Sequence, residues 1–166
     1  SGGRLLINGE VANDLSPRQA RSLQARVDRV IARTDGTQVA INQVVWDGGD
    51  TLVPLPGERK ARELGTAPRG FGTAAREPSD TCRYYQFCTY HSRDWHGIEN
   101  RMQSCVLHND RGGIFGSYRN NQPPNIMLSH IYTGVLQNLT AGRLPGGAYV
   151  PVVSPEEAAE EIHANS

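Results

Sequence analysis

The chain has 166 residues, and its 17 basic and 17 acidic side chains give a formal net charge of zero. With this balance, the composition gives no indication of binding to nucleic acid or to an anionic membrane surface. The length suits one domain, or a small domain with an extension. No apolar run approaches the ~20 residues that a membrane-spanning helix requires. Eighteen glycines and ten prolines favour turns and short strands over long helices.

The first region, residues 5–56, is predicted to hold a helix followed by a β-hairpin. Ser16 is a good N-cap, and Pro17 suits the first helical position, where its missing N–H has no cost. Asp35 and Gly36 are predicted to end the helix. The apolar positions that recur at helical spacing are Ala20, Leu23, Val27, Val30 and Ile31.

The hairpin is predicted from two apolar runs on either side of a turn. Val39, Ile41 and the run 44–46 form one strand pattern, residues 47–50 are a strong turn signal, and 51–55 return as the second strand.

Three further regions follow. Residues 57–81 lack periodicity and are predicted to be a linker, and 154–166 form an acidic tail, predicted as one or two helical turns or as a frayed end. Region 82–153 is all-β by pattern and favours a small sandwich or Greek-key barrel. The fold class expected is α+β, mainly β. The candidate strands are 86–90, 98–104, 114–119, 126–132, 135–140 and 148–153.

All three cysteines lie within 24 residues, which suits disulfide chemistry in an oxidising compartment. We favour a Cys82–Cys88 bond, because it closes a short loop just before the first strand of the domain. Cys88–Cys105 across the hairpin is the competing pair. Either bond leaves one thiol that is free, buried or shared with another chain. A zinc site is less favoured, since Cys-x5-Cys is not the tight spacing of zinc ribbons.

A second signal in the same block is an aromatic, four residues, an aromatic, one residue and a glycine: Tyr90, Trp95 and Gly97. This spacing describes a folded-over hairpin in which glycine adopts a conformation unfavourable to other residues and a ring covers the fold. It is similar to the signature of a βγ-crystallin Greek-key motif.

Together with Cys-x5-Cys-x-Tyr and Cys105, the block resembles the Streptomyces-type metalloproteinase inhibitor family of secreted actinobacterial proteins. The segment Ser117 to Gln122 is similar to that family's serine–aromatic–Asn-Asn-Gln segment, and the upstream helix and hairpin resemble the extension that many extracellular members carry. The resemblance spans residues 14–132 and is strongest over 82–122.

The resemblance implies a secreted βγ-crystallin-like domain, monomeric by default, with peptidase inhibition as its activity. The crystallin calcium motif aligns with 112–117, where this chain keeps only the final serine, Ser117. A calcium ion needs several oxygen ligands, so no calcium site is expected there, and no cofactor is expected elsewhere.

An enzymatic function is not expected, and no catalytic residues are assigned. His91, His96 and His108 lie near the cysteines in sequence, but oxidised cysteines and exposed turn histidines are favoured over a Cys–His nucleophile pair. His91, Asp94 and His96 could chelate a transition metal at the hairpin tip, although polar turn residues are the favoured interpretation.

The function expected is a secreted, non-enzymatic, protein-binding domain that inhibits a protease, in particular a metalloprotease, by presenting a rigid loop. The alternative is a structural or antimicrobial toxin-like protein that acts at cell surfaces or in an extracellular assembly. The chain is expected as a monomer or a disulfide-linked dimer. The candidate binding loops are 106–113 and the proline-rich segment made of Asn120, Asn121, Gln122, Pro123, Pro124 and Asn125.

Overall fold

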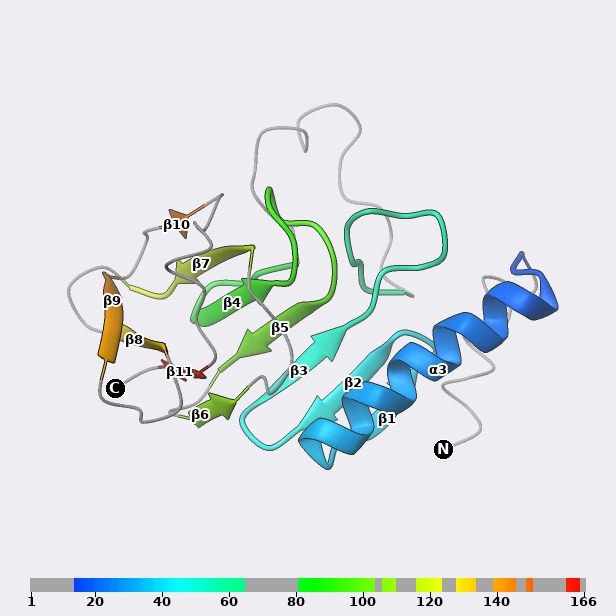
Figure 1. The fold of residues 1–166 in the computed structure, drawn as a ribbon, viewed down its shortest axis with the longest axis horizontal. Coiled ribbons are helices and arrows are strands. Elements are labelled where there is room, and N and C mark those ends of the chain that lie inside the picture. The colour runs from blue at the N-terminus through cyan, green and yellow to red at the C-terminus, as the bar shows by residue number, and fades with distance from the viewer. Residues whose placement is uncertain are drawn as a thin grey trace.

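The computed structural model places a helix and two antiparallel sheets along the chain (Figure 1). The elements are mostly strands, so the expected α+β class with a mainly β composition is confirmed. No helix in the described part of the chain is long and apolar enough to cross a membrane. The structure describes residues 14–64, 81–103, 106–109, 116–123, 128–133, 139–145, 149–150 and 161–164.

Helix α3, Pro17–Thr34, forms where the sequence predicts it. The Ser16 hydroxyl accepts a hydrogen bond from the Gln19 N–H at 3.1 Å, and the Ser16 N–H donates to the Gln19 side chain at 2.9 Å. This reciprocal pair satisfies two of the backbone donors left over at a helix start. Asp35 ends the helix at a positive φ of 52°, and its N–H bonds to the Ile31 carbonyl at 2.9 Å.

Removal of the cap gives a first test of the local structure. We expect Ser16→Ala to lower the free energy of unfolding by about 1 kcal/mol, because the N-terminal N–H group loses its acceptor. Ser22→Ala, at an exposed position inside the same helix, is the control and should not destabilise the protein, since alanine has the higher helix propensity. Urea titrations of the three proteins measure both effects. Equal stability of the Ser16→Ala variant and the unmodified protein would show that the cap contributes nothing.

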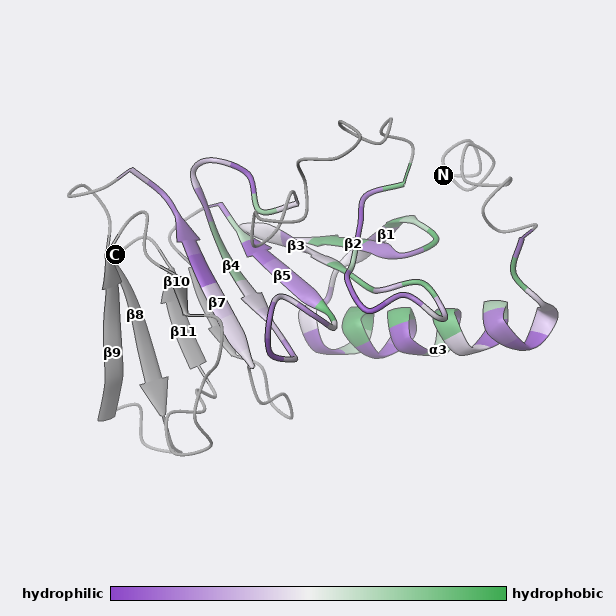
Figure 2. Ribbon diagram, turned by 90° about the horizontal axis from the view of Figure 1, so that it is seen from above, coloured by the Kyte–Doolittle hydropathy of each residue, from purple (hydrophilic) through white to green (hydrophobic). Residues whose placement is uncertain are grey.

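The apolar face of α3 packs on one face of the first strands. In Figure 2, hydrophobic and hydrophilic positions alternate along the helix, which lies beside β1 and β2. The apolar helix residues pack against apolar residues of the hairpin and form one hydrophobic core. Its buried members are Leu23, Val27, Val30, Val44, Val53 and Leu55.

The larger sheet has seven strands in the order β1-β2-β3-β5-β4-β7-β10, with every pair antiparallel. The strands are β1 Thr37–Ala40, β2 Gln43–Trp46, β3 Gly49–Leu52, β4 Gln86–Tyr90, β5 Glu99–Met102, β7 Ser117–Asn121 and β10 Tyr149–Val150. The β3–β5 pairing joins the predicted extension, 5–56, to the predicted domain, 82–153, within one sheet.

The smaller sheet has the order β6-β11-β8-β9, again antiparallel. Its strands are β6 Val106–Asn109, β8 Leu128–Thr133, β9 Leu139–Pro145 and β11 Glu161–Ala164. The prediction of a binding loop over 106–113 is therefore wrong at 106–109. The predicted helical or frayed tail is also wrong at 161–164, because pairing with β6 and β8 outweighs the local preference of the acidic sequence.

The first predicted hairpin strand is two strands, with a turn at Ile41–Asn42 between β1 and β2. Asn42 is fully buried there, and its amide donates to the Val53 carbonyl at 3.1 Å and to the Arg62 carbonyl at 2.8 Å. Both acceptors are distant in sequence, so no local signal predicts this turn. The β-branched residues on either side of it instead predict one continuous strand. The second bond also ties the start of the predicted linker to the sheet.

Candidate functional site

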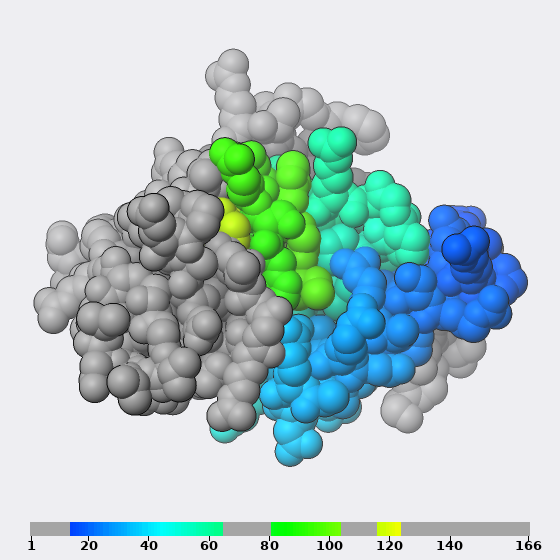
Figure 3. All heavy atoms as spheres, in the orientation of Figure 1, coloured from blue at the N-terminus to red at the C-terminus, as the bar shows by residue number. Residues whose placement is uncertain are grey.

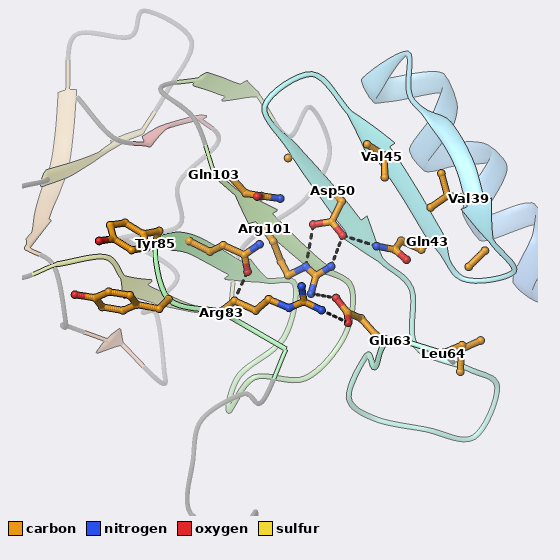
Figure 4. A pocket seen from close by; sticks show the side chains of 14 residues that line it. Val39, Gln43, Val45, Asp50, Glu63, Leu64, Arg83, Tyr85, Arg101 and Gln103 are labelled. Atoms are coloured by element: carbon orange, nitrogen blue, oxygen red, sulfur yellow. Dashed lines mark hydrogen bonds and ion pairs between the residues drawn. The ribbon is translucent and has the colours of Figure 1, made fainter. Parts of the chain in front are cut away.

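A groove of about 640 Å³ opens on the face of the sheet opposite α3 (Figure 4). It is lined by β1, β2, β3 and β5, by residues 63–64, and by the turn 83–86. Figure 3 shows the segments around 60 and around 90 side by side on the molecular surface. The volume of the groove falls in the range of about 300–1,000 Å³ that is typical of binding pockets.

The floor of the groove is a buried ion cluster centred on Arg101, whose side chain is 3% exposed. The β3–β5 register sets Arg101 opposite Asp50, and the guanidinium binds both oxygens of that carboxylate, with Nε to Oδ1 at 2.8 Å. Arg101 Nη1 also donates to Glu63 Oε1 at 2.6 Å and to the Thr81 carbonyl at 3.0 Å. This two-point contact fixes the guanidinium plane.

The cluster continues to both sides of Arg101. Gln43 donates to Asp50 Oδ2 at 2.7 Å, and Arg83 Nη2 lies 2.5 Å from Glu63 Oε2. Two cations therefore pair with two carboxylates: Arg101, which is 3% exposed, and Arg83, which is 62% exposed. These bonds tie residue 63, from the predicted linker, and residue 83 to the sheet.

Mutual pairing favours the charged forms of Arg101 and Glu63. Burial by itself would lower the pKa of Arg101, but the hydrogen bonds and charges of Asp50 and Glu63 raise it above its usual value. Burial would likewise raise the pKa of Glu63, yet Arg101 and Arg83 hold it below the ordinary range. The groove thus has a rigid, charge-balanced floor.

The rim carries the exposed apolar surface. Among the described residues the large hydrophobic side chains that stay exposed are Val45 (42%), Tyr84 (58%) and Tyr85 (58%), and all three line this groove. The two tyrosine rings meet edge to face with centroids 4.5 Å apart. Exposed apolar surface gathered at one hollow is typical of binding sites.

The turn that presents the two rings, residues 83–86, is here called the tyrosine turn. The Arg83 N–H donates to the Gln86 side chain at 2.8 Å, and the Gln86 N–H donates back to the Arg83 carbonyl at 3.1 Å. Tyr85 adopts a positive φ of 73°, and its N–H bonds to the Asn121 carbonyl of β7 at 2.9 Å. The backbone is therefore fixed while the rings face solvent.

The disulfide flanks this turn. Cys82 and Cys88 are bonded, with Cα atoms 6.0 Å apart, which confirms the favoured pairing over Cys88–Cys105. Asn121 donates from its amide to the Cys82 carbonyl at 2.9 Å. The bridge packs with Tyr90 and Trp95 in a buried cluster. Cys105 itself lies outside the described residues.

The folded hairpin predicted from Tyr90, Trp95 and Gly97 connects β4 and β5. The Tyr90 and Trp95 rings meet edge to face with centroids 5.5 Å apart, and Gly97 has a φ of 85°. Asp94 and Trp95 also have positive φ, as the central residues of a type I′ turn do. Ser117 holds this hairpin, since its hydroxyl donates to the Ser92 carbonyl at 2.7 Å and accepts from the Trp95 N–H at 3.1 Å.

The proline-rich candidate loop is corrected by the structure. Asn120 and Asn121 belong to β7, and Asn120 and Gln122 are 0% and 1% exposed. Pro123 is buried too, so residues 120–123 do not form an exposed loop. β-Strand pairing of 120–121 with residues 86–87 of β4 draws these amides inward. Pro124 and Asn125 lie outside the described residues.

The histidines do not form a site among the described residues. His91, Asp94 and His96 do not come together as a group that could hold a metal ion. The His108 side chain lies outside the description. The one such group in the described part is made of Cys82, Cys88 and Glu99, whose sulfurs are already joined.

Glu99 of β5 is a buried carboxyl that the sequence did not single out, 1% exposed. Its oxygens accept hydrogen bonds from the Thr81 hydroxyl and, at 3.1 Å, from the Tyr90 hydroxyl. Burial raises its pKa to about 7, against the lowering effects of Thr81, Arg101 and Tyr90.

The groove itself was also missed by the sequence reasoning. Tyr84 and Tyr85 lie between the two bonded cysteines, but Phe87 in the same interval is buried, so this position alone does not predict which side chains are exposed. Comparisons of the chain with models of protein families, with curated proteins and with solved structures find no match.

Proposed function

We propose that the chain is a secreted, non-enzymatic inhibitor that binds a metallopeptidase through the tyrosine turn and the adjoining groove. The observation that carries the proposal is the tyrosine turn itself. Its two tyrosines are each 58% exposed. Its backbone is held at both ends by hydrogen bonds and lies next to a disulfide.

A turn of this kind suits inhibition because its ordering cost is met before the partner arrives. Binding penalises each loop or side chain that must be immobilised, so a fixed turn retains more of its contact energy. Tyrosine is enriched among the residues that dominate interface energetics. A peptidase offers a concave substrate cleft, into which two exposed rings on a rigid turn can insert.

The strand arrangement supports the suggested family. Four strands follow one another in the chain: β4, β5, β6 and β7. Strand β7 lies beside β4, β4 lies beside β5, and β6 belongs to the smaller sheet. A fourth strand returning to the first is the defining relation of a Greek key. The ring-covered hairpin and the Ser117 bonds to it also suit a βγ-crystallin-like motif.

The Cys82–Cys88 bond supports secretion. Disulfides persist in oxidising compartments and are rare in the reducing cytosol.

Inhibition assays against a panel of secreted metallopeptidases test the proposal. We expect dose-dependent inhibition of at least one enzyme, and we expect Tyr84→Ala and Tyr85→Ala each to weaken it by about thirtyfold, the effect of losing an interface anchor worth about 2 kcal/mol. Arg21→Ala, an exposed change on α3 across the sheet, is the matched control and should leave inhibition unchanged. Inhibition that survives both tyrosine substitutions would contradict the assigned surface, and its absence throughout the panel would contradict the function.

A further inference from the structure

We propose that reduction of the Cys82–Cys88 disulfide turns this part of the fold into a site for a divalent metal ion of the zinc type. Its protein ligands are the Cys82 and Cys88 sulfurs and the Glu99 carboxylate. This property is separate from inhibition, which uses the oxidised protein.

The three ligand atoms are already gathered. The two sulfurs and a Glu99 oxygen all lie within 4.8 Å of one another. Zinc binds thiolate at about 2.3 Å and carboxylate at about 2.0–2.2 Å, which sets tetrahedral ligand atoms about 3.6–3.8 Å apart. Once the bond between the sulfurs is broken, small side-chain rotations reach that geometry.

The carboxylate is held in place by neighbouring hydroxyls. Thr81 and Tyr90 each donate to a different oxygen of Glu99. Outer hydrogen bonds of this kind orient a ligating carboxylate and are a regular part of metal sites.

The surroundings suit a thiolate site as well. Cys82 and Cys88 are 4% and 0% exposed, and they pack with the Tyr90 and Trp95 rings. After reduction this cluster would hold two buried thiols against a carboxyl group. A mixed sulfur and oxygen ligand set suits zinc.

A phosphine passes two electrons to the disulfide and takes the oxygen atom of one water molecule, and the two protons of that water convert the sulfurs to thiols. Metal binding then releases both thiol protons, together with the Glu99 proton when that group is protonated.

The experiment uses the full chain, reduced anaerobically with a phosphine and titrated with Co²⁺ as a spectroscopic substitute for Zn²⁺. We expect thiolate-to-cobalt absorption that saturates at one metal ion per reduced chain, and none for the oxidised chain. Added Zn²⁺ should abolish the absorption. Cys105→Ser is the matched control and should bind as the unmodified chain does. Glu99→Gln should weaken binding by about tenfold or more, and Cys88→Ser by more than that.

Pulsed alkylation of the reduced, unmodified chain gives a readout that needs no variant. Mass spectrometry should find that Zn²⁺ slows the modification of Cys82 and Cys88 and leaves the modification of Cys105 unchanged. Near-ultraviolet circular dichroism follows folding in parallel, and if reduction loosens the fold, Zn²⁺ should restore the signal. The inference is overturned by a reduced chain that binds no metal, by protection of Cys105 in place of the pair, by equal affinity of Glu99→Gln, or by a loosened fold that Zn²⁺ does not restore.

Discussion

Replacement of Arg101 by leucine is expected to lower the free energy of unfolding by about 3–5 kcal/mol. The side chain is 3% exposed and binds two carboxylates, Asp50 and Glu63. Its loss leaves the Asp50 carboxylate, 5% exposed, in a buried position without its main cation. It also releases the contacts by which residues 63 and 81 are tied to the sheet.

The matched control is a solvent-exposed ion pair in the same region. Arg62 lies 3.0 Å from Glu58, with both side chains substantially exposed. Since such pairs contribute little, Arg62→Ala should change stability by less than about 1 kcal/mol. Guanidinium chloride titrations at neutral pH measure both proteins. If the two variants lose similar, small amounts of stability, the buried cluster does not hold the fold in the way described.

The second large effect is a pH dependence caused by Glu99 in the oxidised protein. Because burial raises its pKa to about 7, the folded protein binds this proton more tightly than the unfolded chain does. The resulting stabilisation is complete below the unfolded value, near pH 4.5, and is lost as the pH rises through about 7. A shift of this size corresponds to about 3 kcal/mol.

Several neighbours act on Glu99. The Thr81 and Tyr90 hydroxyls and the Arg101 guanidinium favour its charged form, whereas the Asp50 carboxylate disfavours it. Burial outweighs the three favourable contacts, so the pKa of Glu99 is raised.

Glu99→Gln tests this assignment, because glutamine mimics the protonated carboxyl in size and both neighbouring hydroxyls can also accept its amide protons. We expect the variant to match the unmodified protein at pH 4 and to be more stable by about 3 kcal/mol at pH 8. Denaturant titrations between these pH values, with a chelator present, measure the difference. Glu58→Gln, which removes an exposed carboxylate, controls for the loss of one charge. Parallel stability curves for the Glu99→Gln variant and the unmodified protein would refute the account.

The sequence was most informative where local signals decide the structure. Ser16 and Pro17 define the start of α3, and Asp35 its end, because capping depends on adjacent residues. Residues 86–90 form a strand as predicted, and Tyr90, Trp95 and Gly97 fold the hairpin, since a positive φ at glycine is a local requirement.

Local signals failed where distant partners decide. β6 and β11 form through pairing with each other, between residues 52 to 58 positions apart, and the turn at Asn42 is held by carbonyls of residues 53 and 62. The groove follows the same rule. Asp50, Glu63 and Arg101 meet only because β3 pairs with β5, and no spacing in the chain announces that register.

We propose that the tyrosine turn is the surface that contacts a peptidase. The most direct test is hydrogen–deuterium exchange of the chain alone and in complex with a metallopeptidase that it inhibits. We predict new protection of the backbone amides at residues 83–86 and at the groove strand β2, with exchange on the exposed face of α3 unchanged. Protection confined to α3, with unaltered exchange at 83–86, would contradict the claim.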